Sequence, residues 1–213
     1  MKIKKILALI VFIIIAGSGI SLVLKANIGV GAWDALATVG ANLFNIKIGT
    51  VGIILNISCV FFQIVLLRKD FKLMQLLQII ISFALGSIIN FVLYDLLGGF
   101  NVEANYLLQM TLFIVGIVVC SFAVAAIMVL DIITLPLEGA CSAVSSITKK
   151  SFPVLRQLVD VISIVIVLIA TFTLNLDPII REGTILAMLV FGPLLGIFMK
   201  VHKNIFKKMN LID

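Results

Sequence analysis

Six long apolar runs dominate this chain and limit what it can fold into. A helix needs about 20 apolar residues to cross the hydrocarbon core of a membrane, and helices satisfy their backbone hydrogen bonds internally. Only 12% of the 213 residues are charged and 62% are hydrophobic, whereas soluble domains carry about 25% charged residues. The sequence therefore predicts an all-α, polytopic membrane helix bundle, with residues 1–213 forming a single integral membrane domain. The expected transmembrane spans are about 6–24, 49–67, 74–97, 107–130, 154–174 and 183–199.

Basic residues gather at alternate ends of these spans. Cytoplasmic loops of membrane proteins are enriched in Lys and Arg, so both termini of this multi-pass protein are expected to be cytoplasmic. Lys25 and Lys47 depart from the pattern. The net charge is +6, but the Lys and Arg residues lie between the apolar runs and do not gather in one basic face. This distribution predicts the lipid bilayer as a partner and argues against binding of nucleic acid. The patterned residues are Lys2, Lys4, Lys5, Arg68, Lys69, Lys72, Lys149, Lys150, Lys200, Lys203, Lys207 and Lys208.

Polar residues recur at a constant offset of 104 positions in two halves of the chain. The pairs at this offset are Asn27 with Asp131, Ala32 with Pro136, Asp34 with Glu138, and Asn56 with Asp160. With three spans in each half, the second half must enter the membrane from the opposite face. This predicts an inverted repeat, with repeat one over about 6–97 and repeat two over about 107–200. Such repeats are frequent in secondary transporters, which bind substrate at the repeat interface.

The connections after the first and fourth spans are long and still apolar. They cover residues 25–48 and 131–152. Each is predicted to be a re-entrant or broken helix, which is tolerated at membrane depth only where protein or a water-filled cavity covers it. The alternative is an amphipathic helix on the membrane surface.

Charged and amide side chains inside the apolar runs are the candidates for a substrate or ion site. Arg156 and Asp160 are four residues apart and therefore share one helical face. A charge at the centre of a spanning helix costs about 2.5–3.5 kcal/mol, so such a pair normally faces the bundle interior or water. An internal salt bridge between helices is the alternative. The full candidate set is Asn27, Trp33, Asp34, Asn56, Asn90, Asp131, Glu138, Arg156 and Asp160.

Asp34 and Glu138 follow the broken stretches, where carboxylates beside exposed helix ends can hold a cation or an amine. Helix capping is the alternative for both residues. Trp33 beside Asp34 is interpreted as an aromatic-belt residue at the membrane interface. Gly192 and Gly196 form a GxxxG pattern, which predicts close helix packing.

Signals for catalysis are missing from the sequence. No Walker motif, nucleophile elbow or dinucleotide fingerprint is present. The single histidine, His202, lies in the basic tail, which argues against a histidine-based metal or proton site, and Cys59, Cys120 and Cys141 follow no metal-binding spacing. We therefore expect no enzymatic activity, no cofactor and no metal.

A motif around the first connection consists of Gly19, Ser21, Leu22, Ala26, Gly29, Gly31, Trp33, Asp34 and Leu36. With this motif the chain resembles the YczE/YyaS/YitT group of small bacterial integral membrane proteins. Later features are also similar, at Gly49, Gly86, Arg156 with Asp160, Gly183-Thr184 and Gly192-Pro193. Ala32 stands where Pro is frequent in that group, and Asn90 where an acidic residue is frequent. The resemblance implies a bacterial plasma-membrane protein of about six helices, for which a transport role is suggested.

Three functions fit the sequence. The first is a transporter or permease for an unknown small solute, plausible as a homodimer because six helices are few for a carrier. The second is a substrate-capture subunit that docks on a separate ATPase complex through the small residues Ala8, Gly17 and Gly19. The third is a membrane scaffold or accessory protein in which the buried charges are only structural.

Overall fold

The computed structural model describes residues 2–102 and 104–212, and within these ranges the chain is helical without strands. Six of the helices are long and apolar enough to cross a membrane. The predicted bundle of six spans is therefore confirmed, and the chain is a multi-pass membrane protein. The six candidate spans are Ile3–Ala26, Ile48–Asp70, Leu73–Leu96, Tyr106–Leu130, Phe152–Leu174 and Glu182–Lys208.

Helix boundaries repeat along the chain with the predicted offset. Adding 104 to the bounds of α1 (Lys2–Ala26) and α2 (Ala32–Phe44) gives the bounds of α5 (Tyr106–Leu130) and α6 (Pro136–Thr148). The next helices, α3 (Ile48–Leu67) and α7 (Phe152–Leu174), also begin 104 residues apart. Each half then ends in a last spanning helix. These are α4 (Leu77–Asn90), which continues into the π-helical turn η3 (Phe91–Leu96), and α8 (Glu182–Lys208).

The same offset relates the residues that stop these helices. Asn27 and Asp131 end α1 and α5 in the left-handed conformation, with φ of 52° and 47°. Asn45 and Lys149 do so after α2 and α6, with φ of 52° and 60°. Short polar side chains tolerate this conformation better than branched ones do. The repeat that the polar residues predict is therefore also a repeat of backbone geometry.

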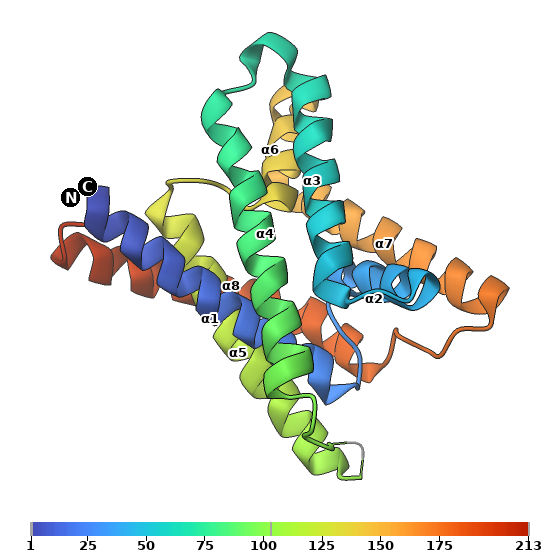
Figure 1. Ribbon diagram of the computed structural model, residues 1–213. Helices are drawn as coiled ribbons and strands as arrows, with labels where there is room; N and C mark the ends of the chain where they lie inside the picture. The colour runs from blue at the N-terminus through green and yellow to red at the C-terminus, as the bar shows by residue number, and fades with distance from the viewer. Residues whose placement is uncertain (1, 103, 213) are drawn as a thin grey trace.

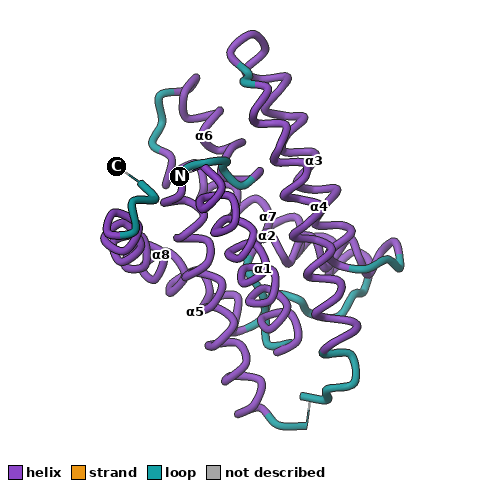
Figure 2. The backbone as a smooth tube through the Cα atoms, turned by 60° about the vertical axis from the view of Figure 1, so that its left-hand side comes forward, coloured by secondary structure: helices purple, strands orange, loops and turns teal. Residues whose placement is uncertain are grey.

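The two halves pack on each other through equivalent pairs of helices. α1 lies along α5 and runs antiparallel to it (Figure 1). α2 packs on α7 as α3 packs on α6, and α1 contacts α4 as α5 contacts α8. One pair of equivalent contacts breaks the symmetry. α3 packs closely on α4, whereas α7 makes no comparable contact with α8 among the described residues. α3 and α4 run side by side and project from the rest in both views (Figures 1 and 2).

Small residues bring α1 and α5 into backbone contact at the core of the molecule. A Cβ on Gly19 would lie 2.7 Å from the backbone nitrogen of Cys120, and one on Gly116 would lie 2.9 Å from the carbonyl oxygen of Gly19. Beside them, the fully buried Ser21 donates its hydroxyl to the carbonyl of Gly17 at 2.8 Å. Close approach through small residues is the usual packing of membrane helices.

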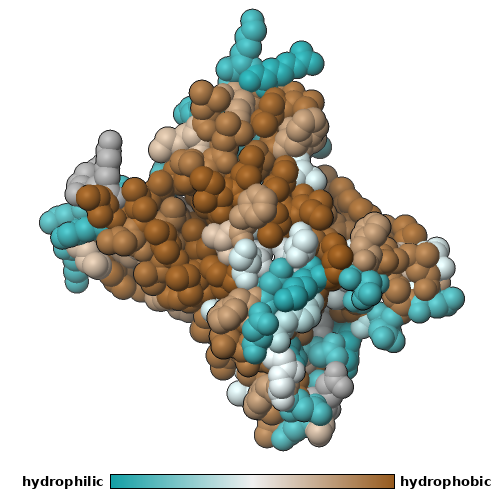
Figure 3. Space-filling view, in the orientation of Figure 1, coloured by the Kyte–Doolittle hydropathy of each residue, from teal (hydrophilic) through white to brown (hydrophobic). Residues whose placement is uncertain are grey.

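The surface matches a protein held in lipid. Hydrophobic residues cover most of the face shown, and hydrophilic residues gather at its tips and over its lower centre (Figure 3). We define the first face as the one where α1 begins. The end of α8 lies there too, because Phe206 on α8 contacts Phe12 on α1. The second face is the opposite one, which α1 reaches at Ala26.

Two expectations about the last span are wrong. Gly192 and Gly196 do not mediate close packing within the chain, because a Cβ on either would meet no described atom within 4 Å. His202 does not lie in an exposed basic tail, because α8 continues through it and leaves it 2% exposed. Its ring lies between those of Phe12, Phe122 and Phe206, and its Nε2 lies 3.1 Å from the carbonyl oxygen of Phe122.

Candidate functional site

Arg156 and Asp160 lie on the face of α7 that turns toward the protein. Leu155, Ser163 and Val167 on the same helix are buried, whereas Val161 and its neighbours are exposed to the lipid side. Nη1 of Arg156 forms an ion pair with Oδ1 of Asp160 one turn along the helix. The two side chains keep only 26% and 25% of their surface exposed. The predicted orientation of this pair toward the bundle interior is confirmed.

Two more carboxylates reach this ion pair from the short helices. Glu138 lies in the first turn of α6 and places Oε1 3.9 Å from Nε of Arg156. Asp34 lies in the first turn of α2, within electrostatic range of both Arg156 and Asp160. We call Asp34, Glu138, Arg156 and Asp160 the polar centre. It joins four of the five charged candidates from the sequence, and the fifth, Asp131, lies elsewhere.

The polar centre shows that α2 and α6 are re-entrant. α2 follows a span that ends at the second face, and α6 follows a span that ends at the first face. Glu138 in the first turn of α6 nevertheless forms an ion pair with Arg156, and Asp34 in the first turn of α2 lies within electrostatic range of the same arginine. Two segments that enter from opposite faces come this close only if they turn toward the middle of the molecule. This arrangement favours re-entrant helices over helices that lie on the membrane surface.

The charges of the polar centre do not balance. Three carboxylates face one guanidinium, so the formal charge is −2 when all four groups are ionised. Asp34 makes no ion pair and no side-chain hydrogen bond with a described residue. The positive ends of α2 and α6 lie beside Asp34 and Glu138 and offset part of the charge. An uncompensated charge at membrane depth still costs about 2.5–3.5 kcal/mol.

Trp33, which the sequence suggested as an aromatic-belt residue, is partly buried and packs on other helices of the protein. Its side chain packs on the cluster that contains Cys59, Leu137 and Cys141, between α3 and α6. Its indole nitrogen is buried and finds no hydrogen-bond partner among the described residues. A buried polar group without a partner costs about 1–3 kcal/mol. Trp33 therefore places an unused hydrogen-bond donor next to the polar centre.

The other predicted site residues lie elsewhere. Asn27 and Asp131 are exposed at the ends of α1 and α5. Asn90 caps α3, because its Oδ1 accepts from the backbone N–H of Gly49 at 2.9 Å and its Nδ2 donates to Thr50 Oγ1 at 3.1 Å. Asn56 is partly buried one turn before Cys59 on α3. The structure thus brings Asp34, Glu138, Arg156, Asp160 and Trp33 together and leaves these four outside.

A pair of buried glutamines was missed by sequence reasoning. Gln63 on α3 and Gln78 on α4 are both 0% exposed, and Gln63 Nε2 donates to Gln78 Oε1 at 2.9 Å. Gln63 Nε2 also donates to the carbonyl of Pro136 at 3.1 Å, the first residue of α6. A Cβ on Gly139 would lie 2.7 Å from Gln63 Oε1, so a larger residue there would displace the glutamine amides. The glutamines therefore fix the re-entrant start of α6, two residues before Glu138.

We expect Gln63→Leu to lower the free energy of unfolding by about 1–3 kcal/mol, because it leaves the buried Gln78 amide and the Pro136 carbonyl without a partner. The measurement is reversible unfolding in mixed micelles, with Gln157→Leu on the exposed face of α7 as the control. A loss for Gln63→Leu no larger than for the control would contradict the assigned contacts.

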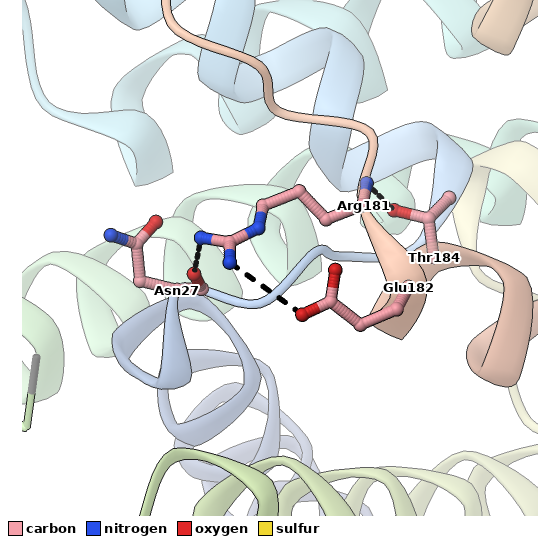
Figure 4. Close-up of polar contacts among 4 residues, drawn as sticks. All are labelled: Asn27, Arg181, Glu182 and Thr184. Atoms are coloured by element: carbon pink, nitrogen blue, oxygen red, sulfur yellow. Dashed lines mark hydrogen bonds and ion pairs between the residues drawn. The ribbon is translucent and has the colours of Figure 1, made fainter. Parts of the chain in front are cut away.

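The connection from α1 to α2 is fastened to the start of α8 (Figure 4). Nη1 of Arg181 donates to the carbonyl of Asn27 at 2.7 Å, while its Nη2 lies 3.5 Å from Glu182 Oε1. The backbone N–H of Gly183 donates to the carbonyl of Ile28 at 2.8 Å. Gly29, at φ +117°, leaves no room for a side chain beside Thr184. The Gly183-Thr184 pair in the sequence was the available signal for this contact.

The equivalent connection from α5 to α6 is packed differently. It borders a pocket of about 210 Å³ toward the first face, lined by Lys72, Met74, Gln75, Gln78, Asp131, Ile132, Ile133 and Thr134. A second, larger and more open pocket of about 650 Å³ lies at the second face, lined by Ala41, Asn42, Asn45, Ile46, Lys47, Ile48, Tyr94, Asn175, Leu176 and Asp177. The two halves therefore share one fold but differ in how their connections are held.

No curated protein and no solved structure matches the chain. One family model does match, over residues 3–200, and it describes a family of unknown function, DUF6198. The matched range contains both re-entrant helices and every residue of the polar centre. The chain belongs to the family of unknown function DUF6198.

Proposed function

We propose that this membrane protein is a transporter for a small solute and that the polar centre is its binding site. The observation that carries the proposal is the meeting of Asp34, Glu138, Arg156 and Asp160 where two re-entrant helices begin. Ionisable residues inside a membrane are costly and mark substrate or ion pathways in most cases. Broken helices that meet at the interface of an inverted repeat form the binding sites of many secondary transporters.

The unequal packing of the two connections also supports transport. Alternating access moves one repeat against the other around a fixed site, so a carrier at rest is expected to hold its two halves differently. Here Arg181 and Thr184 hold the connection from α1 to α2 against the start of α8, whereas the connection from α5 to α6 lines a pocket.

The capture-subunit alternative loses its proposed docking surface. A Cβ on Gly17 would lie 2.6 Å from Ile88, and Gly19 faces Cys120 at the same close range. These small residues are already used to pack α1 on α4 and α5. An ATPase partner would need another surface.

The remaining features of the proposal come from the sequence. They are a bacterial plasma-membrane location with cytoplasmic termini, no enzymatic step, no cofactor, and a possible homodimer. The open Gly192 and Gly196 surface on α8 supports a second copy. A transport role also agrees with the resemblance to the YczE/YyaS/YitT group.

Solute counterflow in proteoliposomes tests the proposal. Vesicles loaded with each member of a panel of organic cations, organic anions and polyols are diluted into the same labelled solute. We expect at least one class to accumulate through the native protein and not through the Arg156→Leu/Asp160→Leu double variant. Absence of counterflow for every class, with a protein shown to be folded by its melting transition, would favour the scaffold function.

A further inference from the structure

We infer that the polar centre binds a small organic cation carrying a hydrogen-bond acceptor and exchanges it for a proton. This inference rests on the proposed transport function and specifies its substrate class. Its first support is the charge of the centre, where one guanidinium stands against three carboxylates and forms ion pairs with Asp160 and Glu138. An anionic solute would meet this surplus of negative charge.

Asp34 is the group best placed to receive the cation. It projects from the start of α2 and has no ion-pair or side-chain partner among the described residues. The charged groups within electrostatic range of Asp34 are Arg156 and Asp160, and the thiol of Cys120 lies within range of Asp34 and Glu138. The thiols of Cys59 and Cys141 lie on the Glu138 side of the centre. When no solute is bound, a proton on Asp34 or Glu138 reduces the charge. An entering monovalent cation then displaces one proton, which leaves the exchange electroneutral.

The walls of the site favour an organic cation over a metal ion. Leu137, Ala140 and the two thiols form an apolar surface against which Trp33 packs. The carboxylates do not form a three-residue set that could hold a metal ion within the described part of the chain. An indole ring beside carboxylates suits an alkylated ammonium or guanidinium group, which it attracts through its π face.

The buried N–H of Trp33 is the second, independent observation. It has no hydrogen-bond partner among the described residues, and none of the carboxylates accepts from it. A hydroxyl or carbonyl oxygen on the solute would satisfy it. This separates the proposed solute from a simple tetraalkylammonium ion, which has no acceptor.

Three matched probes test the inference in proteoliposomes that contain a pH-sensitive dye. Choline is permanently cationic and has a hydroxyl, ethyltrimethylammonium has the same charge without it, and isethionate has the hydroxyl on an anion. We expect an inward choline gradient to raise the internal pH at least tenfold faster than an isethionate gradient. Ethyltrimethylammonium should exchange several-fold more slowly than choline.

The variants locate the effect. Asp34→Asn should abolish choline–proton exchange, whereas Asp131→Asn, with the same charge change at an exposed position, should not. Trp33→Phe keeps a ring but no N–H and should remove the preference for choline over ethyltrimethylammonium. Thermal stabilisation of each variant by choline in detergent provides a readout that does not need transport.

The outcomes separate this inference from the proposed function. Exchange of isethionate, or of a panel anion or polyol, without exchange of either cation would overturn the cation class and leave transport standing. Choline movement without proton release would overturn the exchange step. Absence of movement and of stabilisation for all three probes would overturn the inference, and the counterflow panel then decides whether transport falls with it.

Discussion

Replacing Arg156 alone by leucine is expected to lower the free energy of unfolding by about 3–5 kcal/mol, the largest effect of any single substitution in the polar centre. The change removes the only positive charge of the polar centre and leaves the partly buried Asp160 and Glu138 without an ion-pair partner. Breaking a buried pair is costly because it leaves an uncompensated charge. Unfolding of the purified protein by a denaturing detergent measures the loss, with Lys69→Leu in the exposed α3–α4 connection as the control.

The double variant Arg156→Leu/Asp160→Leu should recover most of that stability, because packed apolar residues often replace a buried ion pair at little cost. Solute binding should nevertheless be lost in the double variant, since two of the four groups of the polar centre are gone. A double variant no more stable than the single one would contradict the view that charge imbalance causes the loss. A stable double variant that retains counterflow would contradict the assigned site.

Gly49→Ala is expected to destabilise the protein by about 3 kcal/mol, the upper end of the range for overpacking a well-filled core. A Cβ on Gly49 would overlap the carbonyl oxygen of Gly86 on α4 and would lie 2.6 Å from Oδ1 of Asn90. Neither neighbour can move freely, because one is helix backbone and the other already caps the N–H of Gly49. α3 and α4 would have to separate along their closest contact.

Gly52→Ala, one turn further along α3, is the matched control. A Cβ there meets no described atom within 4 Å, and alanine is favoured over glycine in a helix by about 0.8–1.0 kcal/mol. We therefore expect Gly52→Ala to leave the melting temperature unchanged or to raise it slightly. Equal effects of the two substitutions would show that α3 and α4 do not approach as closely as described.

The periodic features of the fold were predictable from the sequence, because hydrocarbon thickness fixes the length of a spanning helix. The offset of 104 residues could also be read directly, since Asp34 and Glu138 keep their place in the first turns of α2 and α6. Asn27 and Asp131 share that offset for a different reason, which is that both end a helix in the left-handed conformation. The repeat of polar residues therefore identified equivalent positions in the two halves, but it did not show which of them belong to the polar centre.

The contacts that sequence reasoning missed depend on side-chain direction within apolar runs. Gln63 and Gln78 lie in spans whose exposed and buried faces are equally hydrophobic, so no periodicity shows that both amides point inward. His202 has lysines on either side and was assigned to a tail for that reason, yet its own face of α8 meets Phe122. Trp33 was judged by its residue type, although its neighbours on α3 and α6 decide its place.

Cysteine accessibility tests the central claim that the polar centre is a solute path. In a background without Cys59, Cys120 and Cys141, single substitutions Asp34→Cys and Glu138→Cys are treated from each side of the membrane with an impermeant thiol reagent. Val161→Cys, on the exposed apolar face of α7, is the control. We predict modification at both centre positions and none at the control. Silence at both positions in a folded protein would show that no water reaches the centre, and would contradict the transport account.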